Sequence, residues 1–390
     1  MIANLSVDGE KFTAKTNWEI INQYVEFDYS DHCQPDKLIT YSNQSFREEI
    51  RGGLNMSLLG MPIKIGTLDV SNRLVLPPIA TSKSQENGEI TDELCQYYAE
   101  KSAGGHIGLL ITEHSYISPE GKAGKGQMSI AKDSDIAGLE RLVSTIHQAN
   151  TKTFAQINHA GARAKQEIIG CLPKSASSIG HPKFAKNESL PLEMTYDDIQ
   201  KVIADFAAAA IRAKKAGYDG VEIHAAHAYL LTQFYSPLTN KREDQYNGYS
   251  IEGRIKLHLE IIHAVREVVG SDFPIAIRLG ASDHTTGGTT IEDSLIAVKA
   301  FEKAGIDLLD ISGGFSSYVN PNSTEQGYFS DMTEAIKRNV EIPVILTGGI
   351  VEVTVAEKLL REEKADMIGV GRAIFKDSNW AKQAFLALEK

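Results

Sequence analysis

At residues 220–229 the chain reads Gly220-Val221-Glu222-Ile223-His224-Ala225-Ala226-His227-Ala228-Tyr229, a short apolar run followed by two imidazoles and a phenol. The apolar part is typical of a buried strand, and a segment of helical period, 196–216, precedes it. His224, His227 and Tyr229 therefore lie where a strand ends. Such a cluster can hold an oxygen atom and transfer a proton.

The same order of strand and helix repeats along the chain from residue 72 onward, which is the pattern of strand-helix units around a parallel sheet. Thr91, Thr195 with Asp198, Gly217 and Gly305 stand where helix caps are expected. The eight expected strands are 74–76, 107–112, 153–157, 220–223, 274–279, 308–311, 343–346 and 367–370. The expected helices are 92–103, 135–149, 196–216, 251–269, 291–304, 329–338, 353–361 and 379–388.

Eight such pairs with nearly continuous apolar strands predict an α/β fold, a closed (β/α)8 or TIM barrel. Polar or glycine residues follow almost every strand, among them Pro78, His114 and Gln156. In a barrel these positions converge on one rim. An open doubly wound sheet is the alternative, and it would scatter some of them.

Two segments lie outside the repeat. Residues 1–57 are polar, and we treat them as an N-terminal extension of unknown role, a small cap, a hairpin or a disordered tail, before a barrel domain at 58–390. Residues 160–194 are too long for an ordinary loop and contain Pro173, Pro182 and Pro191. A long loop on the active rim is expected to shape or cover a substrate pocket.

The composition excludes several classes of protein. With 390 residues and 42% hydrophobic content the chain can bury a large core. Its net charge of -11 comes from dispersed acidic residues, so we expect neither nucleic-acid nor membrane partners. Cys33, Cys95 and Cys171 are too far apart for a disulfide framework or a compact metal motif. Without a signal peptide or membrane span, the expected location is the cytoplasm, and the oligomeric state stays open, a homo-oligomer included.

Glycines and arginines point to an anionic cofactor. Barrels commonly hold phosphates after strands seven and eight, where Gly348-Gly349 and Gly371-Arg372 fall, and Gly313-Gly314 extend the same wall. Each pair alone is more typical of a simple turn. Arg278 lies in an apolar strand and needs an anionic partner, either a cofactor or an internal carboxylate such as Glu222 or Asp310. Neither a GxGxxG nor a P-loop motif follows the first strand, which disfavours a Rossmann site or an NTPase.

Five stretches in this order together resemble a known family: 70–78, 155–161, 222–229, 236–240 with Arg242, and 369–372. From about residue 59 to the end, the chain resembles the Old Yellow Enzyme family of NADH:flavin oxidoreductases. The resemblance implies a barrel that binds FMN, takes hydride from NADPH or NADH, and reduces the C=C bond of small α,β-unsaturated carbonyl compounds.

The resemblance also implies roles for individual residues. His224 and His227 donate hydrogen bonds to the substrate carbonyl oxygen, and Tyr229 protonates the α-carbon. Gln156 and Arg278 contact the pyrimidine side of the flavin, although a buried structural amide is an equal reading of Gln156. The remaining residues expected at the cofactor are Pro78, Ile79, Ala80, Gly313, Gly314, Gly348, Gly349, Gly371 and Arg372.

The chain departs from the family pattern at several positions, three of which concern the flavin or the substrate pocket. Ala80 stands where relatives have Cys or Thr, Ser82 where many have an aromatic residue, and His114 where a small residue is usual. Two other functions are therefore kept. One is a barrel metal-dependent hydrolase that uses His114, His159, His224 and His227. The other is a flavin-binding partner protein with little turnover.

Overall fold

The computed structural model describes residues 2–7, 10–15, 57–180 and 190–389. The chain forms two compact units, Met1–Met56 and Ser57–Lys390, which are considered separately. In the first unit β1 (Ile2–Val7) pairs with β2 (Glu10–Lys15) in antiparallel fashion. Pro182 of the long loop lies outside the described residues.

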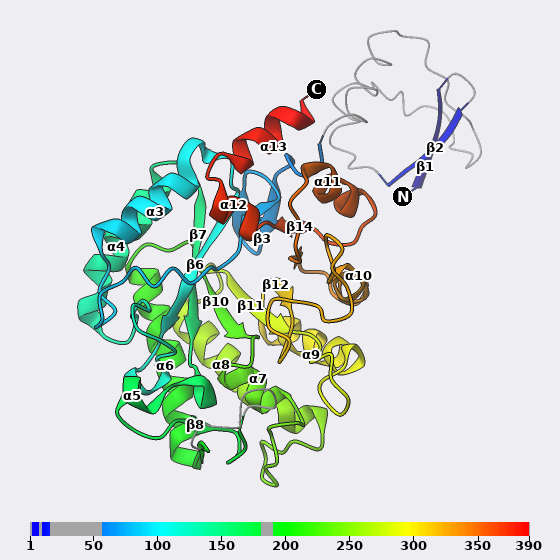
Figure 1. Cartoon of the computed structure of the whole chain (residues 1–390). Coiled ribbons are helices and arrows are strands. Elements are labelled where there is room, and N and C mark those ends of the chain that lie inside the picture. Colours follow the sequence, from blue (N-terminus) through cyan, green and yellow to red (C-terminus); the bar gives the residue numbers. More distant parts are fainter. Residues whose placement is uncertain (1, 8–9, 16–56, 181–189, 390) are drawn as a thin grey trace. The chain divides into compact units, whose positions relative to one another are not determined.

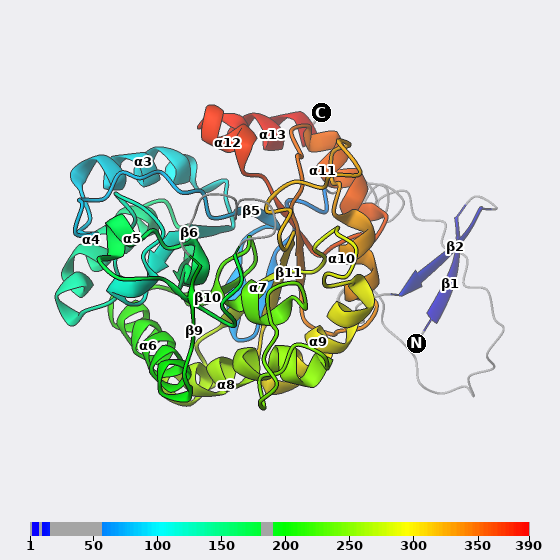
Figure 2. The ribbon, with the colours of Figure 1, turned by 60° about the horizontal axis from the view of Figure 1, so that its bottom comes forward.

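The second unit is a closed parallel barrel, so the predicted fold is confirmed and the open sheet is excluded (Figure 2). The barrel is closed by pairing of β10 with β7, in which Val221 lies opposite Ala155. In order around the barrel the strands are β10 (Gly220–Ala225), β11 (Ile275–Gly280), β12 (Leu308–Ser312), β13 (Val344–Leu346), β14 (Met367–Gly369), β5 (Leu74–Leu76), β6 (Leu109–Tyr116) and β7 (Lys152–Asn158).

All eight expected helices are present and surround the strands (Figure 1). Thr91 accepts a hydrogen bond from the backbone of Leu94, Thr195 and Asp198 form the predicted capping box, and Gly305 ends its helix in the left-handed conformation. The helices are α3 (Asp92–Ser102), α4 (Ile136–His147), α6 (Tyr196–Lys215), α8 (Ile251–Val269), α9 (Ile291–Ala304), α10 (Ser330–Lys337), α11 (Val353–Arg361) and α13 (Trp380–Leu388). No helix in the described ranges is long and apolar enough to cross a bilayer.

Several short elements were not predicted from the sequence. The long loop contains α5 (Gln166–Ile169), β8 (Lys174–Ser175) and β9 (Leu192–Glu193), so it is more ordered than its prolines suggested. The others are α7 (Leu230–Tyr235), α12 (Arg372–Lys376) and the hairpin of β3 (Ile63–Ile65) with β4 (Leu68–Val70). These elements lie at strand ends, where they shape the two mouths of the barrel.

The hairpin seals the amino end of the barrel. Ile65 and Val70 are buried against Val75, Leu109 and Phe154, which come from three successive strands. Higher in the barrel, an otherwise apolar interior gives way to a buried polar layer. Any small-molecule site must therefore open at the carboxyl end of the strands.

The same arrangement of an aspartate and a basic side chain recurs at the amino end of the barrel, where it links neighbouring strands. Asp219, Asp307 and Asp366 each come directly before a strand. Each accepts a hydrogen bond from a backbone N–H at or next to the start of the neighbouring strand, from Thr153, Ile275 and Val344 at 2.9, 2.8 and 3.0 Å. A basic side chain approaches each carboxylate as well. Lys152 pairs with Asp219, and Arg266 and Lys337 pair with the other two.

Candidate active site

Four rings gather where β6 and β10 end. The ring centroids of His224 and His227 are 5.1 Å apart, and that of Tyr229 is 5.0 Å from His224. His114 joins them from β6, with its centroid 5.4 Å from Tyr229 and 6.3 Å from His224. The three residues that the sequence singled out thus form one cluster, together with the ring of His114, which the sequence analysis named as a departure and as a possible metal ligand.

The backbone that carries the cluster is strained. His227 and Ala228 have φ angles of 59° and 62°, a left-handed conformation that non-glycine residues adopt at a cost of about 1–3 kcal/mol each. The turn is held from outside. The side chain of Gln233 donates to the carbonyl of Ala228 at 2.7 Å, and the backbone N–H of His227 donates to that of Gly313 at 3.2 Å. This turn places Tyr229 at the start of α7.

All three expected catalytic groups are in the protonation state that donation requires. Burial, reinforced by neighbouring positive groups, lowers the pKa of His224 and of His227 well below the usual 6.5, so both imidazoles are neutral at pH 7. Burial raises the pKa of Tyr229, which keeps its phenolic proton. Nδ1 of His224 has no partner among the described residues, whereas Nε2 of His227 lies 2.8 Å from Oγ of Ser312.

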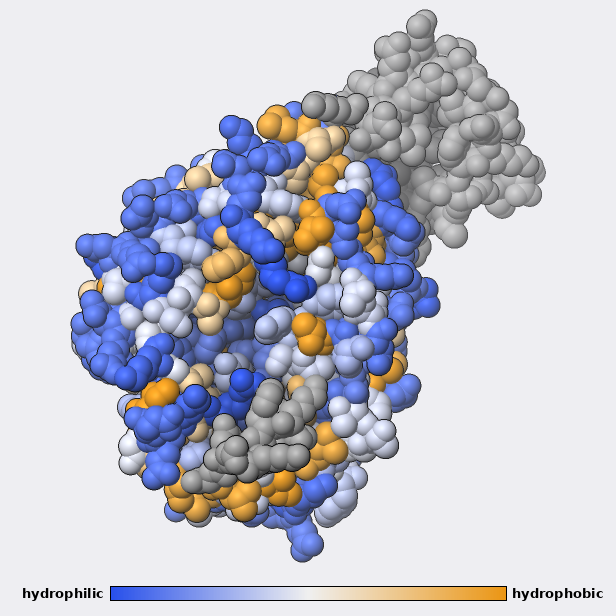
Figure 3. Space-filling model, viewed as in Figure 1, coloured by the Kyte–Doolittle hydropathy of each residue, from blue (hydrophilic) through white to orange (hydrophobic). Residues whose placement is uncertain are grey.

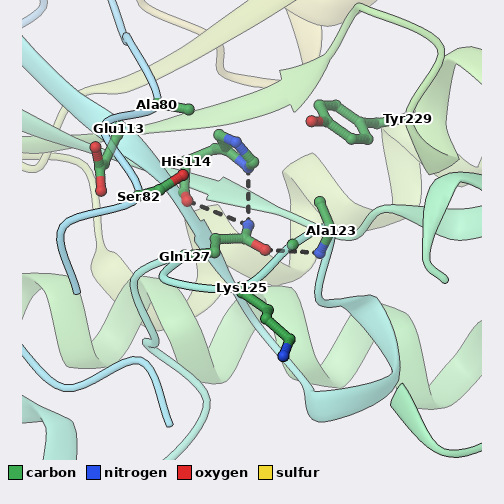
Figure 4. A pocket seen from close by; sticks show the side chains of 9 residues that line it. Ala80, Ser82, Glu113, His114, Ala123, Lys125, Gln127 and Tyr229 are labelled. Atoms are coloured by element: carbon green, nitrogen blue, oxygen red, sulfur yellow. Dashed lines mark hydrogen bonds between the residues drawn. The ribbon is translucent and has the colours of Figure 1, made fainter. Parts of the chain in front are cut away.

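A cavity of about 180 Å³ opens beside the cluster. Figure 4 shows Tyr229 on one side of it and His114 between Tyr229 and Ala80. All three departures that concern the flavin or the substrate pocket face this space. Its lining residues are Ala80, Ser82, Glu113, His114, Ala123, Gly124, Lys125, Gln127 and Tyr229. His224 and His227 do not line it. The ring of His224 packs against those of His114 and Tyr229, and the ring of His227 packs against that of His224.

The polar layer in the barrel lies next to the cluster, since Arg278 is the register partner of His224. The guanidinium Nε of Arg278 is 3.3 Å from Asp310, so the internal carboxylate considered for it is present. Gln156 donates to Glu222 at 2.6 Å. Burial raises the pKa of Glu222 well above its usual value and that of Asp310 to about 6, because one arginine cannot fully compensate two buried acids.

The residues expected to bind a phosphate come together at the ends of β13 and β14, across the barrel from β10. Gly348 and Gly349 have φ angles of 137° and 71°, and within the described chain their N–H groups donate to no other group. A Cβ on Gly349 would stand 3.3 Å from a guanidinium nitrogen of Arg372, and one on Gly371 would stand 3.6 Å from Ile79. The ring of Tyr328 lies against both glycines, 2.8 Å from a Cβ on Gly349, and its hydroxyl accepts from Arg372 at 3.1 Å. The glycines, the guanidinium and the segment after β5 therefore adjoin one another around this ring.

Gly313 and Gly314 contribute in a different way from that expected. Their N–H groups already donate to the carbonyls of Ser317 and Ser282, at 3.1 and 2.9 Å. A Cβ on Gly314 would come within 2.2 Å of Asp283. These two glycines are thus required by close packing between loops, and their amides are engaged within the protein.

Sequence reasoning missed three polar residues of the cavity, Glu113, Lys125 and Gln127. Glu113 is 2% exposed and accepts from the backbone N–H of Thr81 at 2.6 Å. Burial raises its pKa to about 7, although its bonds to Thr81 act in the opposite direction. A charged residue inside the apolar run of β6 was a usable signal, of the same kind as Arg278 in β11. Gln127 lies in a loop without any regular pattern, and nothing in the sequence marked it.

The metal-hydrolase alternative lacks a ligand set. Across the described part of the chain, no three His, Cys, Asp or Glu side chains are grouped so as to hold a metal ion. His159, one of the four required histidines, is buried and accepts from the backbone N–H of Gly161 at 3.0 Å. The four imidazoles therefore do not act as one coordination site.

Comparison with known proteins agrees with this arrangement. Residues 59–390 match the sequence model of the NADH:flavin oxidoreductase / NADH oxidase family. The chain belongs to this family. Its members, the Old Yellow Enzymes among them, are flavoprotein oxidoreductases, so the resemblance seen in the sequence is confirmed.

Individual relatives define how far the likeness extends. An NADH oxidase of Thermoanaerobacter brockii is 39% identical over 326 residues, which cover 82% of this chain but only 50% of that protein. An NADPH dehydrogenase of Clostridium acetobutylicum is 34% identical, with 80% and 90% of the two chains covered. The structure of the old yellow enzyme homologue from Zymomonas mobilis superposes with a TM-score of 0.74 at 25% identity, covering 84% and 92%. The chain thus spans about half of one relative and nearly all of the others.

Proposed function

We propose that this protein is an FMN-dependent ene-reductase, which uses NADPH or NADH to reduce the C=C bond of α,β-unsaturated carbonyl compounds. The observation that carries the proposal is the cluster of two neutral imidazoles and one protonated phenol beside a cavity at the carboxyl end of the barrel. The family to which the chain belongs supports the use of a flavin and a nicotinamide.

The residues present fit FMN. Gly348, Gly349 and Arg372 would hold its phosphate through bare backbone N–H groups and a guanidinium, and the ring of Tyr328, which packs against both glycines and accepts from Arg372, would have to move aside for it. Gly371 and Pro78 to Ala80 would lie along the ring system. Arg278, whose Nε is 3.3 Å from Asp310 without forming a hydrogen bond to it, would face the pyrimidine side with Gln156. Bound FMN would supply the hydride transfer from the nicotinamide to the alkene.

The protein's own groups would then activate the substrate. His224 and His227 would donate to its carbonyl oxygen, stabilising the negative charge that develops there, and His227 would have to exchange its contact with Ser312 for that oxygen. Tyr229 would protonate the α-carbon as general acid. Because the rings are buried, little water competes for these hydrogen bonds.

Spectroscopy of the purified protein tests the proposal. We expect a yellow protein whose flavin absorbance is bleached by anaerobic NADPH or NADH and restored by 2-cyclohexenone. A colourless protein that refuses added FMN would contradict the proposal. A yellow protein that neither nicotinamide reduces would instead favour the flavin-binding partner with little turnover.

A further inference from the structure

His114 and its neighbour Glu113 in β6 both line the cavity, but the two side chains are not equally buried. His114 is the one residue of this strand that is only half-buried, and its ring stacks obliquely against that of Tyr229 at an angle of 36°. Figure 4 shows the ring with Gln127 on one side and the open part of the pocket on the other. The ring is thus placed to contact whatever binds beside Tyr229.

The amide of Gln127 can be oriented in only one way. Its Oε1 accepts from the backbone N–H of Ala123 at 2.7 Å, and its Nε2 donates to the backbone carbonyl of His114 at 3.2 Å. A backbone N–H can only donate and a carbonyl can only accept, so exchanging the two amide atoms would break both bonds. The group 2.8 Å from Nδ1 of His114 is therefore an N–H donor.

This orientation determines the tautomer of His114. Nδ1 must accept, and the amide nitrogen of Asn158 lies 3.4 Å from it on a second side. The ring proton is consequently on Nε2. No group in the described residues accepts from that N–H, which leaves it available to a ligand in the cavity. Burial, with the nearby charge of Arg163, lowers the pKa of His114 to about 4, so the ring is a neutral donor at pH 7.

The charges around the ring favour an anion. The guanidinium of Arg163 lies 5.3 Å from the centroid of Tyr229, and Lys125 lines the cavity with only an exposed contact to Glu86, at 3.4 Å. The acid in the lining, Glu113, has a pKa raised to about 7 by burial and so offsets these cations only in part. A carboxylate entering here would meet the ammonium group of Lys125 and a neutral N–H donor, with the guanidinium of Arg163 near Tyr229 but outside the lining.

We propose that His114, held in its Nε2–H tautomer by Gln127, is a further substrate-binding residue that selects α,β-unsaturated carbonyl compounds bearing a second, carboxylate group. This inference rests on the proposed function, because His224 and His227 would hold the activating carbonyl while His114 holds the carboxylate. The 6.3 Å between the rings of His114 and His224 suits two oxygen groups at opposite ends of one short alkene.

A matched pair of substrates tests the proposal on the flavin-loaded protein. (E)-4-Oxo-2-pentenoate and (E)-3-penten-2-one differ only in having a carboxylate or a methyl group at the far end. For His114→Ala we expect KM for the oxo acid to rise about ten- to hundredfold, the effect of losing a hydrogen bond to a charged group. KM for the pentenone should change less than about threefold. His114→Gln, which keeps an N–H donor, should restore part of the selectivity.

A second variant separates a specific role from a structural one. Gln127→Leu keeps His114 but frees its Nδ1, so we expect a smaller rise in KM that is again confined to the oxo acid. Equal changes for both substrates, in kcat or in KM, would overturn the proposal and leave His114 as a packing residue. So would wild-type protein that shows no preference for the acid.

A binding measurement keeps the test independent of turnover. Calorimetry should show that the oxidised, flavin-loaded protein binds 4-oxopentanoate more tightly than 2-pentanone, and that His114→Ala abolishes the difference. If the acid binds selectively but neither alkene is reduced, the proposed function fails while the assignment of His114 stands. If both alkenes are reduced without any selectivity, the reverse holds.

Discussion

The two ends of this barrel use charged residues in opposite ways. At the amino end, Asp219, Asp307 and Asp366 each hold a backbone N–H and a basic side chain, so their charges are compensated. At the carboxyl end, Glu113 is buried with one oxygen lacking any hydrogen-bond partner in the described structure, and Nδ1 of His224 lacks one too. The backbone there is also strained at His227.

The contrast shows that the charged residues of the amino end stabilise the fold, whereas those of the carboxyl end destabilise it. Compensated charges join neighbouring strands and hold the barrel closed. Uncompensated donors and strained turns cost free energy in the empty protein, and they are explained if a ligand completes them. On the face of the molecule seen in Figure 3, hydrophobic residues occur in separate patches among hydrophilic ones.

The largest expected effect comes from removing the proton donor at the carboxyl end. Tyr229→Phe keeps the ring that packs against His114 and His224 but lacks the phenolic proton. We expect alkene reduction to slow by about 100- to 10,000-fold, the usual contribution of a positioned general acid. Stopped-flow measurement of flavin reoxidation by 2-cyclohexenone gives this rate directly.

The reductive step is the internal control for this variant. The nicotinamide delivers hydride and requires no proton from Tyr229, so flavin reduction by NADPH should stay within about threefold of the wild-type rate. Equal slowing of both steps would show that the phenol supports the site as a whole and does not act as the acid.

The second effect is on the free energy of unfolding. Ionisation of the buried acid should lower it at the carboxyl end and raise it at the amino end. Burial raises the pKa of Glu113 from 4.5 to about 7, so the unfolded chain releases this proton first as the pH increases. The cost of the buried carboxylate is therefore absent below pH 4.5 and grows until the pH passes 7. Relative to Glu113→Gln, the wild-type free energy of unfolding should fall by up to about 3 kcal/mol over this interval, at about 1.4 kcal/mol per pKa unit.

Urea unfolding of both proteins at pH 5 and pH 8 measures this difference. Other titrating groups are common to the two proteins and cancel in the comparison. If the two free energies of unfolding change in parallel with pH, the carboxylate of Glu113 does not destabilise the fold as its burial indicates, and the two ends differ less in their electrostatics.

The sequence predicted the two ends unequally well. Strands and helices followed from apolar periodicity, and α8, α9 and α11 were found at the predicted bounds because their caps and patterns are local. His224, His227 and Tyr229 are near one another in the chain, so their grouping could be read directly. Gln127 and His114 are brought together by a loop whose path depends on tertiary packing, and no local pattern encodes that contact.

The glycines show the same limit. The spacing of Gly348, Gly349 and Arg372 at the last two strand ends was enough to predict that they meet. The role of Gly314 was not predictable, because its need for close packing comes from Asp283, which lies 31 residues earlier in the numbering and on another loop. Composition at a strand end therefore indicates a site, while the hydrogen-bond partner of each amide needs the folded structure.

The smallest expected effect tests the amino end. Burial alone would raise the pKa of Asp219, but hydrogen bonds from His147, the backbone of Thr153 and Lys152 outweigh it, and the pKa lies below the ordinary 3.8. The unfolded chain thus takes up this proton first as the pH falls, so the stabilisation is complete above pH 3.8 and disappears at lower pH. Asp219→Asn keeps an acceptor for Thr153 and removes only the charge, which is worth on the order of 1 kcal/mol at pH 7 because both basic partners are partly exposed.

The matched control is Asp69→Asn, since Asp69 also pairs with a lysine, at 3.4 Å, but its side chain is 83% exposed. Surface charges of this kind change stability by less than about 0.5 kcal/mol. Urea unfolding at pH 7 and pH 3 should therefore show a deficit for Asp219→Asn that narrows at pH 3, and almost none for the control at either pH. A deficit of the same size at both pH values would mean that Asp219 acts through its shape and hydrogen bonds alone. The charge at the amino end would then make no contribution to the free energy of unfolding. The two ends would differ only because burial of Glu113 destabilises the carboxyl end.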